Sequence, residues 1–159
     1  MARSTRITET LVFAQQKAMD LLAVREHSEF ELRRKLRQAL IKTFSGTSVS
    51  QIDSAVDATI SKALEKGWLL AADELSAQKV QQLHRKLKGI QYINQYLTAK
   101  GLPKVSVDWD LELEKALALL ENKVKNKTAL NKDKIRAARF LEARGYDPET
   151  VQKVIHEKF

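Results

Sequence analysis

Cysteine is absent from this chain of 159 residues, which excludes disulfide bonds, thiolate nucleophiles and thiolate metal sites. Glycine and proline are scarce as well, with five and two residues. The frequent residues are Leu, Ala, Lys, Glu, Gln and Arg, which lose little side-chain freedom in a helix. The composition therefore predicts an all-α protein with more than about 60% helix, against a base rate of about a third.

Long hydrophobic runs are also missing, since no stretch approaches the ~18 apolar residues that a membrane-spanning helix needs. Residues 1–6 lead into a mixed polar segment rather than the apolar stretch of a signal peptide. We therefore expect a cytoplasmic protein with no membrane partner.

Charge of one sign predominates, because 28 Lys and Arg oppose 20 Asp and Glu and leave a net charge of +8. Such a surface attracts phosphate backbones, acidic membranes or acidic grooves of proteins. Solvated lysines give the same excess without any partner, so charge alone leaves the function open.

The residue patterns of catalytic and metal sites are not found in the sequence. Its three histidines lie far apart, at His27, His84 and His156. None has a second ligand at metal-binding spacing, so we expect them to serve as surface or helix-end polar groups. The densest acidic run is Asp110, Glu112 and Glu114, which suits the positive dipole end of a helix. Phosphate-cradling loops and nucleophile elbows are also missing, and we expect no enzyme and no cofactor.

Apolar residues recur at helical spacing along most of the chain. This periodicity predicts helices over residues 7–25, from 28 to before 45, 50–66, 72–87, 89–100, 108–126, 131–144 and 148–158. Ser28 and Glu31 have the spacing of a capping box, and Ser50 is expected to cap the third helix. Val105-Ser106-Val107 should be an extended connection.

Two segments can be laid over each other, because residues 97–102 and 141–146 both run from Leu through a basic residue to Gly. This favours repeated helical units, which we place at residues 7–70, 71–108 and 109–159. Ordinary helices often end in the same way, so the pattern by itself leaves the repetition open.

Two of the predicted helices carry a cluster of cations opposite their apolar stripe. With a turn of about 100° per residue, the outward cations group as Arg33, Arg34 and Arg37 on one helix and Lys132, Arg136 and Arg139 on another. A solvated surface explains such faces too, but their few acidic neighbours in the sequence favour a surface that binds a partner.

The segments around these cations resemble the signatures of a known family. The first signature reads Ala18-Met19-Asp20-Leu21-Leu22 and then Arg25-Glu26-His27-Ser28-Glu29-Phe30-Glu31-Leu32-Arg33-Arg34-Lys35-Leu36. The second reads Lys134-Ile135-Arg136-Ala137-Ala138-Arg139-Phe140-Leu141-Glu142-Ala143-Arg144-Gly145-Tyr146. Both resemble the RecX family of RecA regulators, in order and spacing over nearly the whole chain, with Lys66-Gly67-Trp68-Leu69 between them.

The resemblance implies tandem three-helix units in an elongated, curved arrangement. It implies a monomer that binds the RecA filament on DNA, bridges neighbouring RecA subunits and inhibits the recombinase, ATPase and co-protease activities. Its setting would be recombination, DNA repair and the SOS response. The middle of the chain departs from the family, because residues 87–93 keep one Gly and the Ile of the Gly-x-Gly-Pro-x-Arg-Ile turn. The middle unit is also expected to lack its third helix.

Two other classes stay open at this point. One is a helical protein that binds DNA directly, without RecA, and the other is a helical protein associated with RNA or the ribosome. A steep loss of DNA affinity with salt would indicate the first class.

Overall fold

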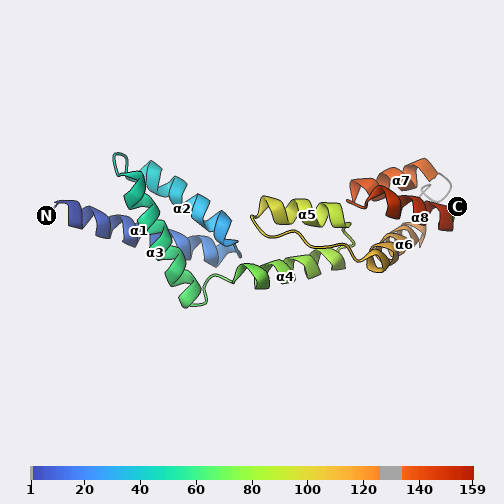
Figure 1. Cartoon of the computed structure of the whole chain (residues 1–159), viewed down its shortest axis with the longest axis horizontal. Helices are drawn as coiled ribbons and strands as arrows, with labels where there is room; N and C mark the ends of the chain where they lie inside the picture. Colours follow the sequence, from blue (N-terminus) through green and yellow to red (C-terminus); the bar gives the residue numbers. More distant parts are fainter. Residues whose placement is uncertain (1, 126–133) are drawn as a thin grey trace. The chain divides into compact units, whose positions relative to one another are not determined.

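The computed structural model describes residues 2–125 and 134–159, which form eight helices (Figure 1). They are α1 (Ala2–Val24), α2 (Glu29–Thr43), α3 (Val49–Glu65), α4 (Ala72–Arg85), α5 (Ile90–Ala99), α6 (Trp109–Lys125), α7 (Lys134–Ala143) and α8 (Pro148–Lys158). These two ranges contain no strand, so the all-α prediction is confirmed. None of the helices described has the length and hydropathy to cross a membrane.

Most predicted helix boundaries are close, and two need correction. The first helix begins at Ala2 rather than at residue 7. Ser50 does not cap α3, because Ser48 has the extended backbone of a cap and its side chain accepts the Gln51 N–H at 3.2 Å. The expected end near residue 126 and start at 131 lie outside the described residues.

The contacts group the chain into two compact units, which differ from the three sequence units. The N-terminal unit contains residues 1–75 and 100–102, and the C-terminal unit contains residues 76–99 and 103–159. The division at 7–70, 71–108 and 109–159 stays a prediction.

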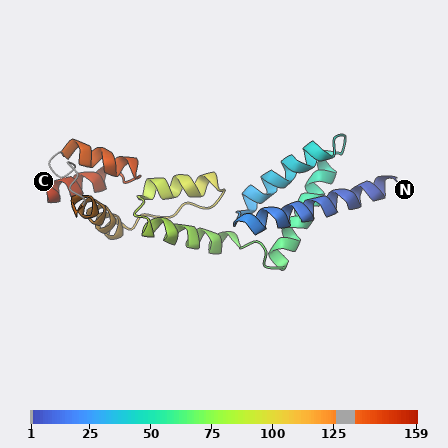
Figure 2. The same ribbon diagram turned by 180° about the vertical axis from the view of Figure 1, so that it is seen from behind.

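In the N-terminal unit, α1, α2 and α3 each pack against the other two, and α3 crosses α1 when seen from both sides (Figures 1 and 2). The small side chains of Ala14 and Ala18 are fully buried, which lets α1 approach its neighbours closely. Leu36 of α2 and Ile60 of α3 fill the centre of this core. Leu64, near the end of α3, is 40% exposed.

The start of α2 is held by a polar cluster. The capping box predicted at Ser28 and Glu31 is present, and the Ser28 hydroxyl also donates to the carbonyl of Lys100. The buried Glu31 carboxylate accepts hydrogen bonds from Arg25 at 3.0 Å and from Lys100 at 2.6 Å. Burial alone would raise the pKa of Glu31, but these hydrogen bonds outweigh it and lower its pKa to about 2.

His27 does not fit the expected role of a surface or helix-end group, because it is buried next to this cluster. Its Nδ1 lies 2.9 Å from the carbonyl oxygen of Arg25, which can only accept, so Nδ1 carries the proton. Nε2 then accepts a hydrogen bond from the Lys35 ammonium, also at 2.9 Å. Burial and the neighbouring cations lower the pKa of His27, which favours this neutral tautomer.

In the C-terminal unit, α8 packs against both α6 and α7. Ala116, Ala137, Leu141 and Val154 are fully buried between these three helices. Residues 102–108 contain no helix, as the sequence predicted for the middle unit. The side-chain amide of Asn94 in α5 holds this extended stretch, because it both donates to and accepts from the Val105 backbone, at 3.0 and 2.9 Å.

The end of α7 and the beginning of α5 meet through backbone atoms. The N–H groups of Gly89 and Gln91 donate to the carbonyls of Arg144 and Gly145, each at 2.9 Å. A Cβ on Gly89 would lie 2.3 Å from the Gly145 carbonyl, and one on Gly145 would lie 2.4 Å from the Tyr92 Cβ. Gly145 also has a φ of +87°, so both its conformation and its surroundings require glycine.

A buried ion pair supports the same junction. Glu112 and Lys115 of α6 lie side by side with side chains 1% and 4% exposed. Glu112 accepts the Ile90 N–H at 2.9 Å, and Lys115 donates to the Lys88 carbonyl at 2.7 Å and to His84 Nδ1 at 2.9 Å. Glu112 lies in the first turn of α6, as the sequence predicted, but its burial and its role in joining α6 to the turn before α5 were not predicted.

Candidate partner-binding surface

The three arginines predicted on α2 do face outward, because Leu32 and Leu36 turn the opposite side of the helix into the core. Arg34 and Arg37 are exposed, and Arg33 is half-buried. They line one groove of about 620 Å³ between α2 and α3. The groove is further lined by Phe30, Gln38, Ile41, Asp53, Val56 and Asp57.

Two of these arginines are already paired within the unit. Arg33 Nε lies 2.9 Å from Glu29 Oε1, and another nitrogen of the same guanidinium contacts Asp57. Arg37 Nε lies 3.3 Å from Asp53 Oδ1. The hydrogen bonds to Asp57 and Glu29 raise the pKa of Arg33. The sequence indicated few acidic residues near these arginines, but the fold brings two aspartates of α3, Asp53 and Asp57, next to them.

Arg34 differs from Arg33 and Arg37. Among the residues that the structure describes, no carboxylate lies within ion-pair distance of its guanidinium. The guanidinium instead lies 5.9 Å from the centre of the Phe30 ring, whose residue is 50% exposed. Together they present a cation and an aromatic surface at one edge of the groove.

On α7 the structure places Arg136 and Arg139 on the exposed side, opposite the buried Ala137 and Leu141. Arg139, like Arg34, has no carboxylate partner within the described part of the chain. Lys132, the third cation predicted for this face, lies outside the described residues. Ile135, one turn before Arg139, is 63% exposed.

A second groove of about 620 Å³ lies between α7 and α8. Its lining residues are Lys134, Ala138, Glu142, Pro148, Val151, Gln152, Ile155, His156 and Phe159. Neither Arg136 nor Arg139 lines it. The α2–α3 groove therefore brings the three predicted residues of α2 together, whereas the α7–α8 groove does not include Arg136 or Arg139.

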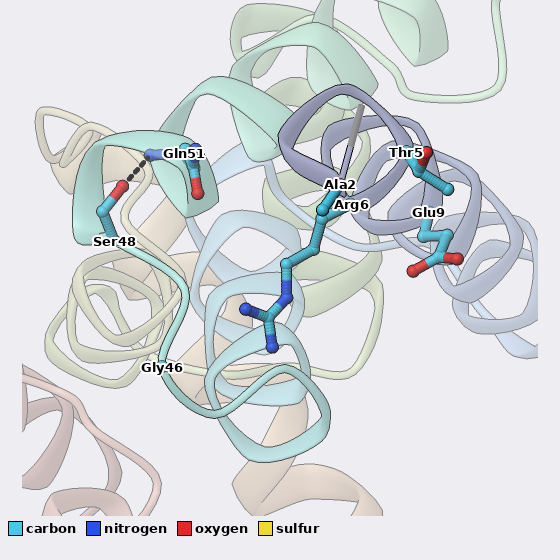
Figure 3. Close-up of a pocket in the computed structure, with 7 residues that line it drawn as sticks. All are labelled: Ala2, Thr5, Arg6, Glu9, Gly46, Ser48 and Gln51. Carbon is cyan, nitrogen blue, oxygen red and sulfur yellow. Dashed lines mark hydrogen bonds between the residues drawn. The ribbon is translucent and has the colours of Figure 1, made fainter.

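A larger cavity of about 720 Å³ occurs at the other end of α2, where α1 faces the loop before α3 (Figure 3). Figure 3 shows Arg6 reaching toward this loop, where its guanidinium donates to the Ser45 carbonyl at 3.5 Å. None of the predicted binding residues is among the described residues that line it. In residues 2–125 and 134–159 there is also no group of three or more His, Asp or Glu that could hold a metal ion.

Comparison with known proteins decides the family. Models of the RecX first and third three-helix domains match residues 14–40 and 110–155. The regulatory protein RecX of Pectobacterium atrosepticum is 32% identical over 155 residues, which cover 86% of this chain and 92% of that protein. The chain belongs to the RecX family. RecX of Pseudomonas fluorescens is 29% identical over 161 residues, which cover 95% of each chain.

The fold agrees with solved RecX structures. The crystal structure of RecX from Lactobacillus salivarius aligns with a TM-score of 0.67 at 17% identity, covering 94% of this chain and 97% of that one. A second crystal structure of a regulatory protein RecX aligns at 0.63 and 15% identity, covering 96% of this chain and 75% of that one. The resemblance inferred from the two signatures is confirmed.

Proposed function

We propose that this RecX-family chain regulates RecA by binding the RecA filament on DNA, and that binding inhibits the recombinase, ATPase and co-protease activities. The observation that carries the proposal is the similarity to regulatory proteins named RecX over 86–95% of this chain. The regulatory name of these relatives favours action by contact rather than by catalysis. We propose that the chain acts as a monomer and without a cofactor.

The outward faces of α2 and α7 are the candidate contact surfaces. They carry Arg33, Arg34 and Arg37 on α2 and Arg136 and Arg139 on α7, and the sixth predicted contact, Lys132, lies outside the described residues. Arginine suits such a surface, since its planar guanidinium binds carboxylates or phosphates bidentately and stays charged at any relevant pH. Two linked surfaces also gain affinity, because binding through the first raises the effective concentration of the second.

The test is the rate of ATP hydrolysis by RecA on single-stranded DNA, measured with increasing amounts of this protein. We expect inhibition at substoichiometric amounts, because a regulator that bridges subunits affects more than one RecA molecule. No effect across a wide concentration range, with the protein folded by circular dichroism, would refute the proposed function.

Direct binding to DNA is the second candidate, favoured by the net charge of +8 and by the unpaired guanidinium of Arg139 among the described residues. A protein held mainly by phosphates should bind naked duplex DNA with a log–log salt slope near −0.9 per contact. A RecA-dependent protein should bind naked DNA weakly and filaments tightly. Titration of both substrates at several salt concentrations separates the two functions.

A further inference from the structure

The helices α2 and α7 share part of their pattern of buried and exposed positions at an offset of 105 residues. Each begins its first turn with a charged residue, Glu29 and Lys134, and at an offset of 105 residues Leu36 and Leu141 both fall on fully buried positions. At the same offset, α2 and α7 each carry an exposed apolar residue followed one turn later by an exposed arginine. These are Phe30 and Arg34 on α2, and Ile135 and Arg139 on α7.

The other arginines of α2 are not repeated. The positions of Arg33 and Arg37 correspond to Ala138 and Glu142 on α7. Their partners change too, because Asp57 and Asp53 of α3 correspond to His156 and Gln152 when α3 and α8 are aligned at their first residues. Arginine and aspartate thus occur together in one unit and are absent together at the matching described positions of the other.

We infer that the two apolar–arginine pairs, Phe30–Arg34 and Ile135–Arg139, are the contacts that dock on the protein subunits of the filament, whereas Arg33 and Arg37 hold α2 to α3. The inference rests on the proposed function and narrows its contact surface. The occupant at each pair is a segment of protein that presents a carboxylate next to an apolar side chain.

Charge and exposure together favour protein over nucleic acid as this occupant. A phosphate backbone would complement the arginines but would leave Phe30 and Ile135, at 50% and 63% exposure, without a surface to bury against. Aromatic residues and arginine are the side chains enriched at protein interfaces and at their energetic centres. The Phe30 ring also supports the Arg34 guanidinium from one side, which reduces the freedom lost when a carboxylate binds.

The apolar–arginine pair occurs twice on this chain, and a filament is a polymer of identical subunits. A filament presents the same surface on each of its identical subunits, so a binder that contacts two subunits through equivalent sites needs the same contact twice. One apolar–arginine pair on each compact unit meets this requirement, whereas Arg33 and Arg37 occur in one unit alone.

The first test compares two double variants that make the same chemical change. Arg34→Gln with Arg139→Gln should weaken inhibition of RecA ATP hydrolysis at least tenfold. Arg33→Gln with Arg37→Gln should weaken inhibition at most threefold and should lower the urea midpoint of unfolding. Equal effects of the two variants on inhibition would overturn the inference, as would a larger effect of the second.

The second test examines the apolar residue. Ile135→Ser should weaken filament binding at least fivefold and leave binding to naked duplex DNA unchanged. Val24→Ser is the matched control, because Val24 is 83% exposed and does not line the α2–α3 groove. If Ile135→Ser binds filaments as tightly as the Val24→Ser control, the apolar contact does not exist.

The third test identifies the occupant directly. Gln38 lines the α2–α3 groove one turn after Arg34 and can be replaced by the photo-crosslinking residue p-benzoylphenylalanine. Irradiation with RecA filaments should give an adduct with the RecA protein. An adduct with DNA alone, or none while filaments are bound, would overturn the inference. A failure of the unsubstituted chain to bind or inhibit filaments would instead refute the proposed function.

Discussion

Replacing Lys115 by Met should strongly destabilise the C-terminal unit. Methionine keeps most of the length of the side chain and removes its charge. The change leaves the Glu112 carboxylate buried without its counter-charge, and it removes the hydrogen bonds to the Lys88 carbonyl at 2.7 Å and to His84 at 2.9 Å. Removal of one partner of a buried pair costs about 3–5 kcal/mol, because the remaining charge keeps its desolvation penalty.

Urea unfolding followed by circular dichroism measures this effect. With a slope of about 2 kcal/mol per molar urea, a loss of about 3 kcal/mol lowers the midpoint by about 1.5 M. Lys153→Met is the matched control, since Lys153 pairs with Glu149 one turn away on a helix at 2.9 Å, but both side chains are more than half exposed. Its midpoint should remain almost that of the parent.

A double variant shows whether the uncompensated charge is the cause. In Lys115→Met with Glu112→Gln, the carboxamide oxygen can still accept the Ile90 N–H and no charge remains buried. Part of the lost stability should therefore return. If Lys115→Met and Lys153→Met lower the midpoint equally, or if the double variant is the least stable, the buried pair does not hold this junction.

Three further perturbations test the fold. Burial and nearby cations lower the pKa values of His27 and His84 in the folded chain below 6.5. As the pH drops below 6.5, these histidines therefore bind protons in the unfolded chain before they do so in the folded chain, and stability should fall. A higher urea midpoint at pH 5.5 than at 7.5 would contradict this. Gly145→Ala should lower the urea midpoint more than Gly67→Ala. Both glycines have a positive φ, but a Cβ on Gly67 meets open space, whereas a Cβ on Gly145 meets the α5 backbone at 2.5 Å. Equal losses would argue against the close approach at Gly145. Amide exchange should be faster over residues 72–107 than in α2 and α3, because residues 72–91 contain only three buried apolar side chains, Leu75, Leu83 and Ile90. Equal protection would contradict the prediction.

Local features of the fold were predictable from the sequence because their causes lie within a few residues. The capping box at Ser28 satisfies amides three residues away, and the Asp147 side chain caps α8 in the same manner. The Asp108 side chain likewise accepts the Leu111 N–H at 3.1 Å at the start of α6. Such signals need no knowledge of the rest of the chain.

Contacts between distant segments were not predictable in this way. Lys100 docks on Glu31 across 69 residues, and the Tyr146 hydroxyl donates to the Leu87 carbonyl across 59. The burial of Glu112 also depends on the turn before α5, which the periodicity of α6 does not reveal. A single sequence carries no signal for any of these partners.

The candidate surface on α2 was also only partly predictable from the sequence. Helical periodicity places Arg33, Arg34 and Arg37 together on the outer side of α2, and on that criterion the three are equivalent. They are distinguished by their partners, because Arg33 pairs with Asp57 of α3 as well as with Glu29 of α2, Arg37 pairs with Asp53 of α3, and Arg34 lies against Phe30. An outward cation is thus a candidate contact only after the acidic residues of the neighbouring helix are known. An existing ion pair must be broken before its arginine can bind a new partner, and the cost of breaking the pair reduces the free energy of binding to that partner.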